Sequence, residues 1–326
     1  MDGREPLGIG MVGAGAVAEL HRLALRQAPE GRLVAVAEPN AARRDAVAAD
    51  WEARPYTSTE ELLADPAVDA VFVLSPLETH APVARAALGA GKHVLIEKPV
   101  GVSAAEVRAL ATLAEGAGLV CMPAHNYIYD PALWQARRLI TEGALGTVCA
   151  AWITYLIYHS EELATHYPGV LRQILTHHLY TVLYLLGRPR RLTALTSRLH
   201  YQELQREDQV MVTLEMRSGA LVHLCASFAV DDHTSSPWSF LVKVLGTRGG
   251  VQHSWRDAWF QRPLATLSWG IAAYEESFVH EDRHFIAACR GGGAPPLSTM
   301  EDAAVAQELI EAAEQALAEG RTVTLS

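Results

Sequence analysis

The chain has 326 residues, half of them hydrophobic, with a formal net charge of -10 and a pI near 5.8. This length favours two domains, each with a sizeable core. The negative charge argues against a nucleic-acid partner, because phosphate binding requires a concentrated basic face.

The cysteines and the apolar runs exclude further classes of protein. The four cysteines are scattered without C-x-x-C spacing, which predicts neither a disulfide framework nor a structural zinc site. They are Cys121, Cys149, Cys225 and Cys289. The sequence contains no basic segment followed by a long apolar run, and no run of about 18 apolar residues. We therefore expect a cytoplasmic protein without a membrane span.

The first third of the chain alternates short apolar runs with alanine-rich helical stretches. It begins "LGIGMVG", "AVAELHRLALRQA", "RLVAVAE", "AARRDAVAADW", and the alternation continues as far as "LVCMPAHNY". Continuous apolar strands separated by helices are typical of a parallel sheet covered on both faces. The pattern predicts an α/β Rossmann domain with a doubly wound, six-stranded parallel sheet over residues 1–124.

From residue 125 the pattern changes to long strand-like runs with fewer helices, such as "TVCAAWITYLIY", "DQVMVTLEMRSG" and "ALVHLCASFAV". This predicts an α+β domain with a large, mainly antiparallel, open-faced sheet over residues 125–298. One strong helix, "VLRQILTHHLYTVLYLLG", lies between its first two strands. Residues 299–326 are predicted to form a helix, capped by Ser298 or Thr299, and then a short strand. Both elements are expected to pack back near the domain junction.

A glycine-rich turn opens the first domain. In "IGMVGAGAVAEL", Gly13, Gly15 and Ala18 form a G-x-G-x-x-A pattern between an apolar strand and a helix. The first glycine permits the tight turn, the second lets a pyrophosphate approach the backbone, and the small third residue lets helix and strand pack closely. The amides at the helix start then face the phosphates. The predicted cofactor-binding residues of this turn are Gly13, Ala14, Gly15, Ala16 and Val17.

Glu38 falls at the end of the second predicted strand, where an acid can bind the ribose hydroxyls of a dinucleotide. A carboxylate there repels a 2'-phosphate, so NAD is favoured over NADP. Arg43 and Arg44 follow closely and leave NADP open. The alternative reading of Glu38 is a solvated strand end.

The stretch "FVLSPLETHAPVARAALGAGKHVLIEKP" resembles the glucose-fructose oxidoreductase and inositol dehydrogenase (Gfo/Idh/MocA) family. The fourth and fifth strands of that family carry a Pro-x-x-x-His turn, an Ala-Gly-Lys-His-Val turn and a Glu-Lys-Pro motif. The resemblance extends along nearly the whole chain, through "EGALG", a histidine-bearing helix ending in "LLG", and "RTVTL".

The resemblance implies roles for five residues of this stretch. Ser75, Pro76 and His80 would line the phosphate and ribose on the nicotinamide side. Glu97 and Lys98 would lie beside the nicotinamide ring, where the family's lysine binds the reacting hydroxyl and assists its proton transfer.

The chemistry of Lys98 also follows from general principles. When a hydride leaves a carbinol carbon, the oxygen must lose a proton to a nearby group and be held against the cofactor. The residue before a proline avoids helical backbone, and a cis Lys98-Pro99 bond is a reasonable hypothesis. The alternative is a surface lysine at a strand end.

The histidine-bearing helix contains a departure from the family pattern, which is Asp-x-x-x-His. Counting back ten residues from Gly187 aligns His177 with the histidine and Gln173 with the aspartate. His177 is the candidate proton-transfer partner of Lys98. A glutamine can orient an imidazole but supplies no charge, so we expect a less basic His177 and a modified reaction. His178 either packs or reaches substrate.

Other candidates for substrate binding are Asn126, next to Tyr127 at the domain junction, and Tyr158. The segments "YLIYHSEELATHYPG" and "VDDHTSSPWSF" are expected to reach the cleft and to supply stacking surfaces and hydroxyl partners. No three histidines stand at zinc spacing, so no metal is predicted.

These observations predict an NAD(H)-dependent oxidoreductase acting on a secondary hydroxyl or ketone of a sugar, a cyclitol or a sugar-derived small molecule. One alternative is a lyase or glycosidase that oxidises a sugar transiently and regenerates its NAD. Another is a non-catalytic dinucleotide-binding sensor, with Gln173 as the first sign of a decayed site. The resemblance further implies a homodimer or homotetramer formed through the open face of the second sheet.

Overall fold

The computed structural model describes residues 5–230, 239–254, 257–262, 265–270, 274–291 and 295–325. The chain divides into two units. The first comprises Met1–Asp130 and Tyr274–Val305, and the second comprises Pro131–Ala273 and Ala306–Ser326.

The first unit alternates strands and helices as predicted. Its strands are β1 (Leu7–Val12), β2 (Gly31–Ala37), β3 (Arg54–Tyr56), β4 (Ala70–Val73), β5 (His93–Glu97) and β6 (Cys121–Ala124). Its helices are α1 (Ala16–Leu25), α2 (Ala41–Trp51), α3 (Thr59–Leu63), α4 (Leu77–Gly89), α5 (Ala104–Ala117), the 3₁₀ helix η1 (Asn126–Tyr129), α9 (Tyr274–Cys289) and the first turns of α10 (Met300–Glu319).

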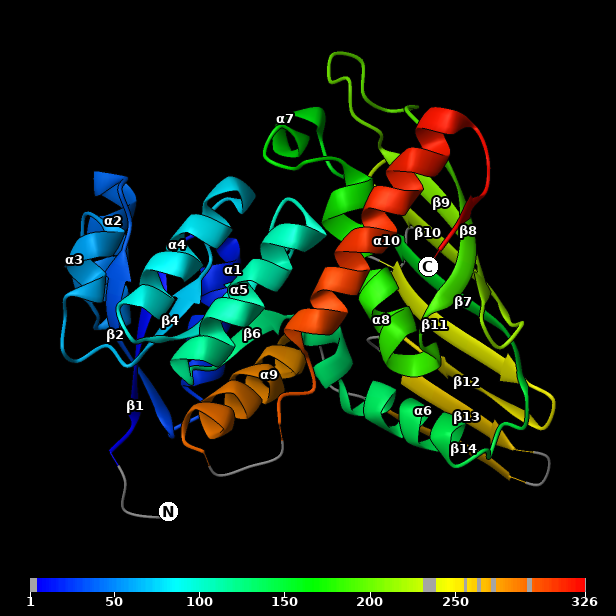
Figure 1. Ribbon diagram of the computed structural model, residues 1–326, viewed down its shortest axis with the longest axis horizontal. Helices are drawn as coiled ribbons and strands as arrows, with labels where there is room; N and C mark the ends of the chain where they lie inside the picture. Colours follow the sequence, from blue (N-terminus) through cyan, green and yellow to red (C-terminus); the bar gives the residue numbers. More distant parts are fainter. Residues whose placement is uncertain are drawn as a thin grey trace. The chain divides into compact units, whose positions relative to one another are not determined.

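The described strands of this unit form a parallel sheet in the order β3-β2-β1-β4-β5-β6. The order reverses between β1 and β4, which is where doubly wound folds bind their ligands. The predicted doubly wound sheet is confirmed. Every residue of β4 is fully buried, because α4 and α5 pack side by side over one face and α1 lies beside α9 (Figure 1).

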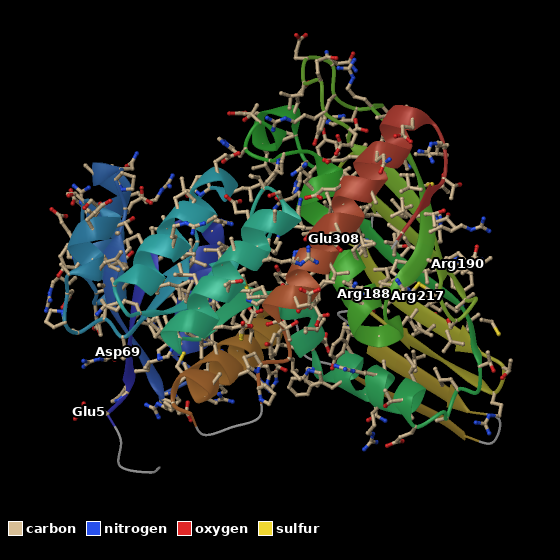
Figure 2. The ribbon with its side chains drawn as sticks, viewed as in Figure 1. Glu5, Asp69, Arg188, Arg190, Arg217 and Glu308 are labelled. Atoms are coloured by element: carbon tan, nitrogen blue, oxygen red, sulfur yellow. The ribbon has the colours of Figure 1, made fainter. Side chains whose placement is uncertain are left out.

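Side-chain caps decide where several of these helices begin. Asn40 caps α2, Ser58 caps α3 and Ser103 caps α5, and each accepts a hydrogen bond from the backbone amide three residues further on. A side-chain contact also lies at the amino edge of the sheet, where the amide of Gly8 in β1 donates to the Asp69 carboxylate at 2.8 Å. Figure 2 labels Asp69 beside the start of β1. These local contacts fix the connections around the sheet.

Helix α9 belongs to the first unit, whereas the sequence assigned its residues to the second domain. The reason is packing. Phe278 and Val279 of α9 are buried in one cluster with Ala24 of α1. Apolar residues more than 250 positions apart in sequence can share a core only when the chain returns, and no local periodicity reveals such a return.

The second unit contains the helices α6 (Pro131–Thr141), α7 (Glu161–Ala164) and α8 (Thr176–Leu186), the π-helical segment η2 (Leu171–Leu175) and the last turns of α10. Its strands are β7 (Val148–Leu156), β8 (Pro189–Ser197), β9 (Gln209–Met216), β10 (Leu221–Ser227), β11 (Ser239–Gly246), β12 (Gly249–His253), β13 (Asp257–Arg262), β14 (Ala265–Gly270) and β15 (Val323–Thr324).

The described strands of the second unit form one sheet in the order β14-β13-β12-β11-β7-β10-β9-β8-β15. All neighbours are antiparallel except β7 and β10, which confirms the predicted large, mainly antiparallel sheet. Helices α6 and α8 lie over one face (Figure 1). Strands such as β9 bury every second residue, which is typical of a sheet covered on one side.

Ion pairs lie at the edge of this sheet but do not determine the register of its strands. Arg190 and Arg191 of β8 both form ion pairs with Glu215 of β9, and Figure 2 labels Arg190 at this edge. Because both arginine side chains are more than half exposed, such pairs stabilise the fold by at most about 1 kcal/mol each. The alternation of buried and exposed residues sets the register instead.

The end of the chain agrees with the predicted cap. The Thr299 hydroxyl accepts a hydrogen bond from the Asp302 amide at 3.0 Å and donates to the Asp302 carboxylate at 2.9 Å, which starts α10. All four cysteines lie among the described residues and are free, and Cys149 is exposed. None of the described helices is long and apolar enough to cross a membrane.

Candidate functional site

The glycine turn between β1 and α1 has the geometry that phosphate binding needs. Gly13 has φ +98°, and a Cβ there would lie 2.7 Å from the carbonyl oxygen of Leu74, so no larger residue fits. A Cβ at Gly15 would meet nothing within 4 Å. Ala18 is fully buried against the sheet. The turn therefore leaves open space in front of the first turn of α1, where an anion is stabilised by the helix.

Glu38, at the carboxyl end of β2, faces this turn. Its carboxylate accepts hydrogen bonds from the amide of Ala14 at 3.2 Å and from the amide of Asn40 at 2.9 Å. Only 4% of the residue is exposed, so Glu38 is not a solvated strand end. The Arg43 guanidinium lies 3.6 Å from the same carboxylate. The acid and a cation thus stand together where the dinucleotide ribose is expected.

His80 joins two segments at the carboxyl edge of the sheet. Its Nδ1 lies 2.7 Å from the carbonyl oxygen of Pro99, and its Nε2 lies 2.7 Å from the carbonyl oxygen of Ser75. Both ring nitrogens therefore contact backbone carbonyl groups of the protein and link the residues after β4 to the segment after β5. The Lys98-Pro99 peptide bond in that segment is cis, as hypothesised. Of the other predicted residues here, Pro76 is the N-cap of α4.

Lys98 directly follows β5 and is partly buried. Its backbone amide donates to the Glu97 carboxylate at 2.8 Å. Burial lowers the pKa of Lys98, and the charge of Glu97 opposes that effect. Burial alone would raise the pKa of Glu97, but its interactions with His21, Lys98 and His80 lower it overall. An amine with a lowered pKa can accept a proton nearer to neutral pH than an exposed lysine can.

Two buried histidines of the first unit were not singled out by the sequence. His125, at the start of η1, has a pKa held well below its ordinary value by burial and by the nearby charge of Lys98. His21, on α1, lies 4.0 Å from Glu97. The one sequence signal for His21 was its position three residues after Ala18, on the same face of the helix.

The predicted histidine helix of the second unit is not a regular α-helix throughout. Gln173 lies in the π-helical segment η2, and His177 follows in the first turn of α8 with 5% of the residue exposed. A π turn holds one more residue than an α turn, so Gln173 and His177 are not separated by one regular α-helical turn. Arg172 anchors the segment through two contacts to Glu314 of α10, at 2.6 and 2.8 Å.

The remaining substrate-binding candidates have different surroundings. Asn126 is 3% exposed and donates from its side-chain amide to the Ser277 hydroxyl at 3.0 Å, while Tyr127 is also buried. His178 is fully buried, and burial lowers its pKa to about 3. Tyr158 is 53% exposed, with its ring 4.8 Å from that of His200. In the segment "VDDHTSSPWSF", residues 231–238 lie outside the described residues.

Lys98 belongs to the first unit, and His177 belongs to the second. The glycine turn, Glu38, His80, Glu97 and Lys98 all lie at the carboxyl edge of one sheet. The pairing of Lys98 with His177 remains a prediction.

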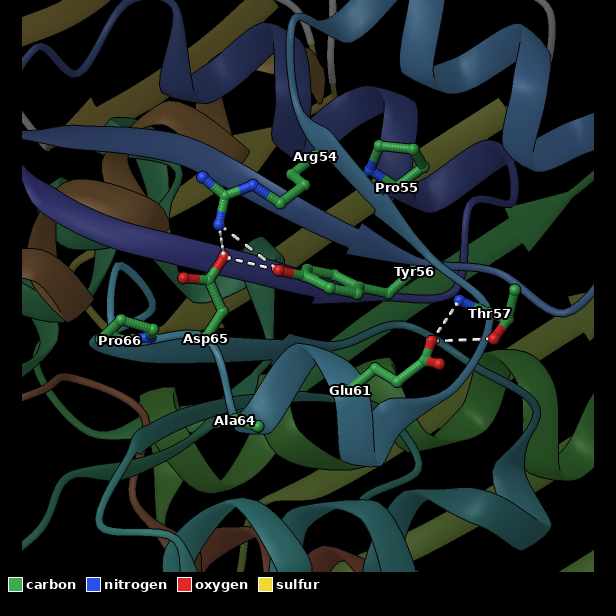
Figure 3. A pocket seen from close by; sticks show the side chains of 8 residues that line it. All are labelled: Arg54, Pro55, Tyr56, Thr57, Glu61, Ala64, Asp65 and Pro66. Atoms are coloured by element: carbon green, nitrogen blue, oxygen red, sulfur yellow. Dashed lines mark hydrogen bonds and ion pairs between the residues drawn. The ribbon is translucent and has the colours of Figure 1, made fainter.

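A surface depression beside β3 has a different character (Figure 3). It is lined by Arg54, Pro55, Tyr56, Thr57, Glu61, Ala64, Asp65 and Pro66. The Asp65 carboxylate accepts from Arg54 at 2.6 Å and from the Tyr56 hydroxyl at 3.0 Å. None of the predicted site residues lines this depression, so it is not the candidate site.

Comparison with known proteins agrees with the fold. A family model described as "Oxidoreductase family, NAD-binding Rossmann fold" matches residues 7–125, and one described as "GFO/IDH/MocA C-terminal domain" matches residues 133–252. The chain belongs to the Gfo/Idh/MocA family of oxidoreductases.

Individual relatives are distant in sequence but cover most of the chain. An inositol 2-dehydrogenase of Rhizobium meliloti is 26% identical over 97% of this chain and 98% of its own length. A 1,5-anhydro-D-fructose reductase of Ensifer adhaerens is 28% identical over 79% of this chain and 78% of its own length. The crystal structure of GenD2 from gentamicin A biosynthesis, in complex with NAD, is 28% identical, with a TM-score of 0.87 over 99% of this chain and 97% of that one.

The burial of His178 predicts a pH dependence of stability. The unfolded chain protonates this histidine near pH 6.5, but the folded protein does so only near pH 3. Stability contributed by the neutral ring is therefore present above about pH 6.5 and is lost as the pH falls toward 3. His178→Leu should remove this loss, which is on the order of a few kcal/mol.

Urea unfolding at a series of pH values measures the effect. The matched control is His166→Leu, at an exposed position, which should keep the wild-type pH dependence. If His178→Leu and wild type lose stability in parallel between pH 6.5 and pH 3, His178 is not a buried neutral residue.

Proposed function

We propose that this protein is an NAD(H)-dependent oxidoreductase acting on a secondary hydroxyl or ketone of a sugar, a cyclitol or a sugar-derived small molecule. The observation that carries the proposal is the placement of Lys98. A partly buried lysine with a lowered pKa lies beside a carboxylate, at the edge of the sheet that also presents the glycine turn and Glu38.

The residues at this edge fit NAD. The glycine turn would hold the pyrophosphate, and Glu38 would accept hydrogen bonds from the adenosine ribose. When bound, NAD supplies a hydride acceptor or donor at its nicotinamide ring. Lys98 would hold the substrate oxygen and, as the neutral amine, take the hydroxyl proton while the carbon loses its hydride. In the reverse direction, Lys98 would return that proton to the carbonyl oxygen.

His177 is proposed to exchange the proton with Lys98, because imidazole can gain and lose a proton near neutral pH. Gln173 can orient a neighbouring side chain but adds no charge. Together with the π-helical turn around it, this residue supports a substrate or a proton path different from that of a plain inositol or glucose dehydrogenase. The exposed Tyr158, beside His200, offers a stacking surface for a sugar ring.

The names of the relatives support the substrate class. One is named for inositol and another for 1,5-anhydro-D-fructose, and both substrates are polyhydroxylated rings. GenD2 was crystallised with NAD. A small polyol with a ring hydroxyl or ketone is therefore the best first substrate to test.

Mutation of Lys98 tests the reaction. Wild-type protein mixed with NAD and a panel of sugars and cyclitols should generate the absorbance of NADH, and Lys98→Ala should lower kcat by about 10² to 10⁴-fold. Lys92→Ala is the matched control, because Lys92 precedes β5, donates to the carbonyl of Val68 and lies at the opposite edge of the sheet.

Three outcomes would contradict this proposal. Turnover that survives in Lys98→Ala would remove the lysine from the reaction. Substrate cleavage without net NADH, detected by mass spectrometry, would support the NAD-recycling lyase or glycosidase. Calorimetry showing NAD binding but no binding of any small molecule would support the sensor.

Glu38 is proposed to favour NAD over NADP. Glu38→Ala removes an acceptor for the ribose hydroxyls and leaves Arg43 available to a 2'-phosphate. We expect NAD affinity to fall about tenfold or more and the preference for NADP to rise. Titration of both dinucleotides measures this, with Glu30→Ala, an exposed carboxylate before the same strand, as the control. Equal changes in both affinities would contradict the assignment.

The open face of the second sheet supports the proposal of a homodimer or homotetramer. Large apolar side chains of four neighbouring strands are exposed on this face: Trp152 (38%), Leu195 (75%), Met211 (38%) and Leu221 (55%). Light scattering should give a mass above one chain, and Leu195→Glu should lower it. A monomeric wild type would contradict the proposal.

A further inference from the structure

A buried cluster of ionisable groups lies next to Lys98, and three of its four members have no part in the reaction proposed above. It consists of His21 on α1, Glu97 at the end of β5, and Glu281 and Asp282 on α9. His21, Glu281 and Asp282 are fully buried, and Glu97 is 7% exposed. Placing several charges out of water costs stability unless they are paired, so their arrangement calls for an explanation.

His21 stands between two carboxylates. Its Nδ1 lies 2.8 Å from Asp282 Oδ1, and its Nε2 lies 4.0 Å from Glu97 Oε1. The other oxygen of Glu97 accepts the hydrogen bond from the Lys98 amide. The chain of contacts therefore runs from α9, through the imidazole and the Glu97 carboxylate, to the backbone of Lys98.

Aromatic side chains fix the imidazole ring in this orientation. Phe72 of β4 and Phe278 of α9 both meet it edge to face, with centroids 5.2 and 5.1 Å away. Because the ring has no room to rotate toward water, its two nitrogens stay directed at Asp282 and Glu97.

The charges of the cluster are consistent with a positive ring. Burial would lower the pKa of His21, but Asp282, with smaller contributions from Glu97 and Glu281, raises it to about 10. Burial raises the pKa of Glu281 well above its ordinary value, which favours a protonated, neutral side chain. The positive ring in turn helps to keep Glu97 ionised.

We propose that His21, held by Asp282, is a positioning residue that keeps Glu97 in place beside Lys98 as a charged partner. The catalytic consequence rests on the proposed function, because it assumes that Lys98 is the group that handles the substrate proton. The inference itself concerns the protonation of Lys98 and can be measured without any substrate.

Other charged groups face these residues and belong to the same balance. His80 contributes to the charge environment of Glu97, and His125 is affected by the charge of Lys98. Changes at His21 and Asp282 should reach Lys98 through Glu97, which lies 4.0 Å from His21 and accepts the hydrogen bond of the Lys98 amide. Loss of the ring should let the Glu97 carboxylate leave its place beside Lys98, and Lys98 would then lose the carboxylate that supports its own charge.

The same cluster offers a competing assignment as a metal site. His21, Glu281 and Asp282 present ligand atoms within 4.8 Å of one another. The direct contact of His21 Nδ1 with Asp282, and the direction of Nε2 toward Glu97, favour an ion pair between protein groups over ligation. Metal analysis of the purified protein separates the two assignments.

The composition of the chain makes the decisive measurement simple, because its only lysines are Lys92, Lys98 and Lys243. Acylation of the intact protein by a small amine-reactive reagent, followed across pH by mass spectrometry of peptides, gives the titration of Lys98. Lys92 and Lys243 serve as internal controls in the same sample.

In His21→Asn and in Asp282→Asn, displacement of Glu97 should move the Lys98 titration to lower pH by about one unit, while the internal controls stay unchanged. Loss of the positive ring charge alone would raise the pKa of Lys98, so a shift to higher pH would overturn the inference. Val279→Ala is the packing control, since it reduces the packing of α9 against α1 without removing a charge, and it should leave the titration in place. Thermal unfolding of each variant shows which ones remain folded. If His21→Asn does not fold, Asp282→Asn still tests the connection between the cluster and Lys98.

A Lys98 titration that is the same in wild type and in a folded variant would overturn the inference. So would a stoichiometric metal ion that wild type holds and His21→Asn lacks. Because no substrate is used, a shifted titration without any turnover would support the inference and count against the proposed function. Turnover that depends on Lys98, together with an unshifted titration, would support the proposed function and overturn the inference.

Discussion

The parallel sheet of the first unit is the constraint on which the site depends. Because all its strands run in one direction, they deliver their carboxyl ends to a single edge, and the order reverses between β1 and β4. The glycine turn follows β1, Glu38 follows β2, and Lys98 follows β5. Residues 85 positions apart in the chain thereby come to one edge, without any of them needing to be near another in sequence.

That edge is held in shape by polar contacts of buried side chains. His80 bridges two carbonyl groups, Glu97 accepts the Lys98 amide, and His21 connects Glu97 to α9. Inside a protein such contacts are electrostatically stronger than in water, and an unpaired member costs more. The same burial that makes the network costly to break also lowers the pKa of Lys98, so the stability and the reactivity of this edge have a common cause.

The second unit contributes a broad sheet and a helix that begins with a π turn. Segments of this kind are rare inside helices and are frequent at functional sites. In this chain the π turn contains Gln173, the residue that departs from the family's Asp-x-x-x-His pattern, and it directly precedes His177. The side chain that departs from the family pattern thus lies in a backbone segment of a kind that is frequent at functional sites.

The sequence alone determined the features that depend on near neighbours: the alternating strands and helices, the glycine turn, the Thr299 cap, and the Glu-Lys-Pro motif with its cis bond. Each is encoded within a few residues, by periodicity, by a required φ or by a short hydrogen bond. Tertiary structure alone decided the return of α9 to the first unit and the pairing of His21 with Asp282. It also decided the contacts of His80 with two carbonyl groups and the full burial of His178. Contacts between residues far apart in the chain and exclusion from water set these features, and neither is written in the local pattern of residues.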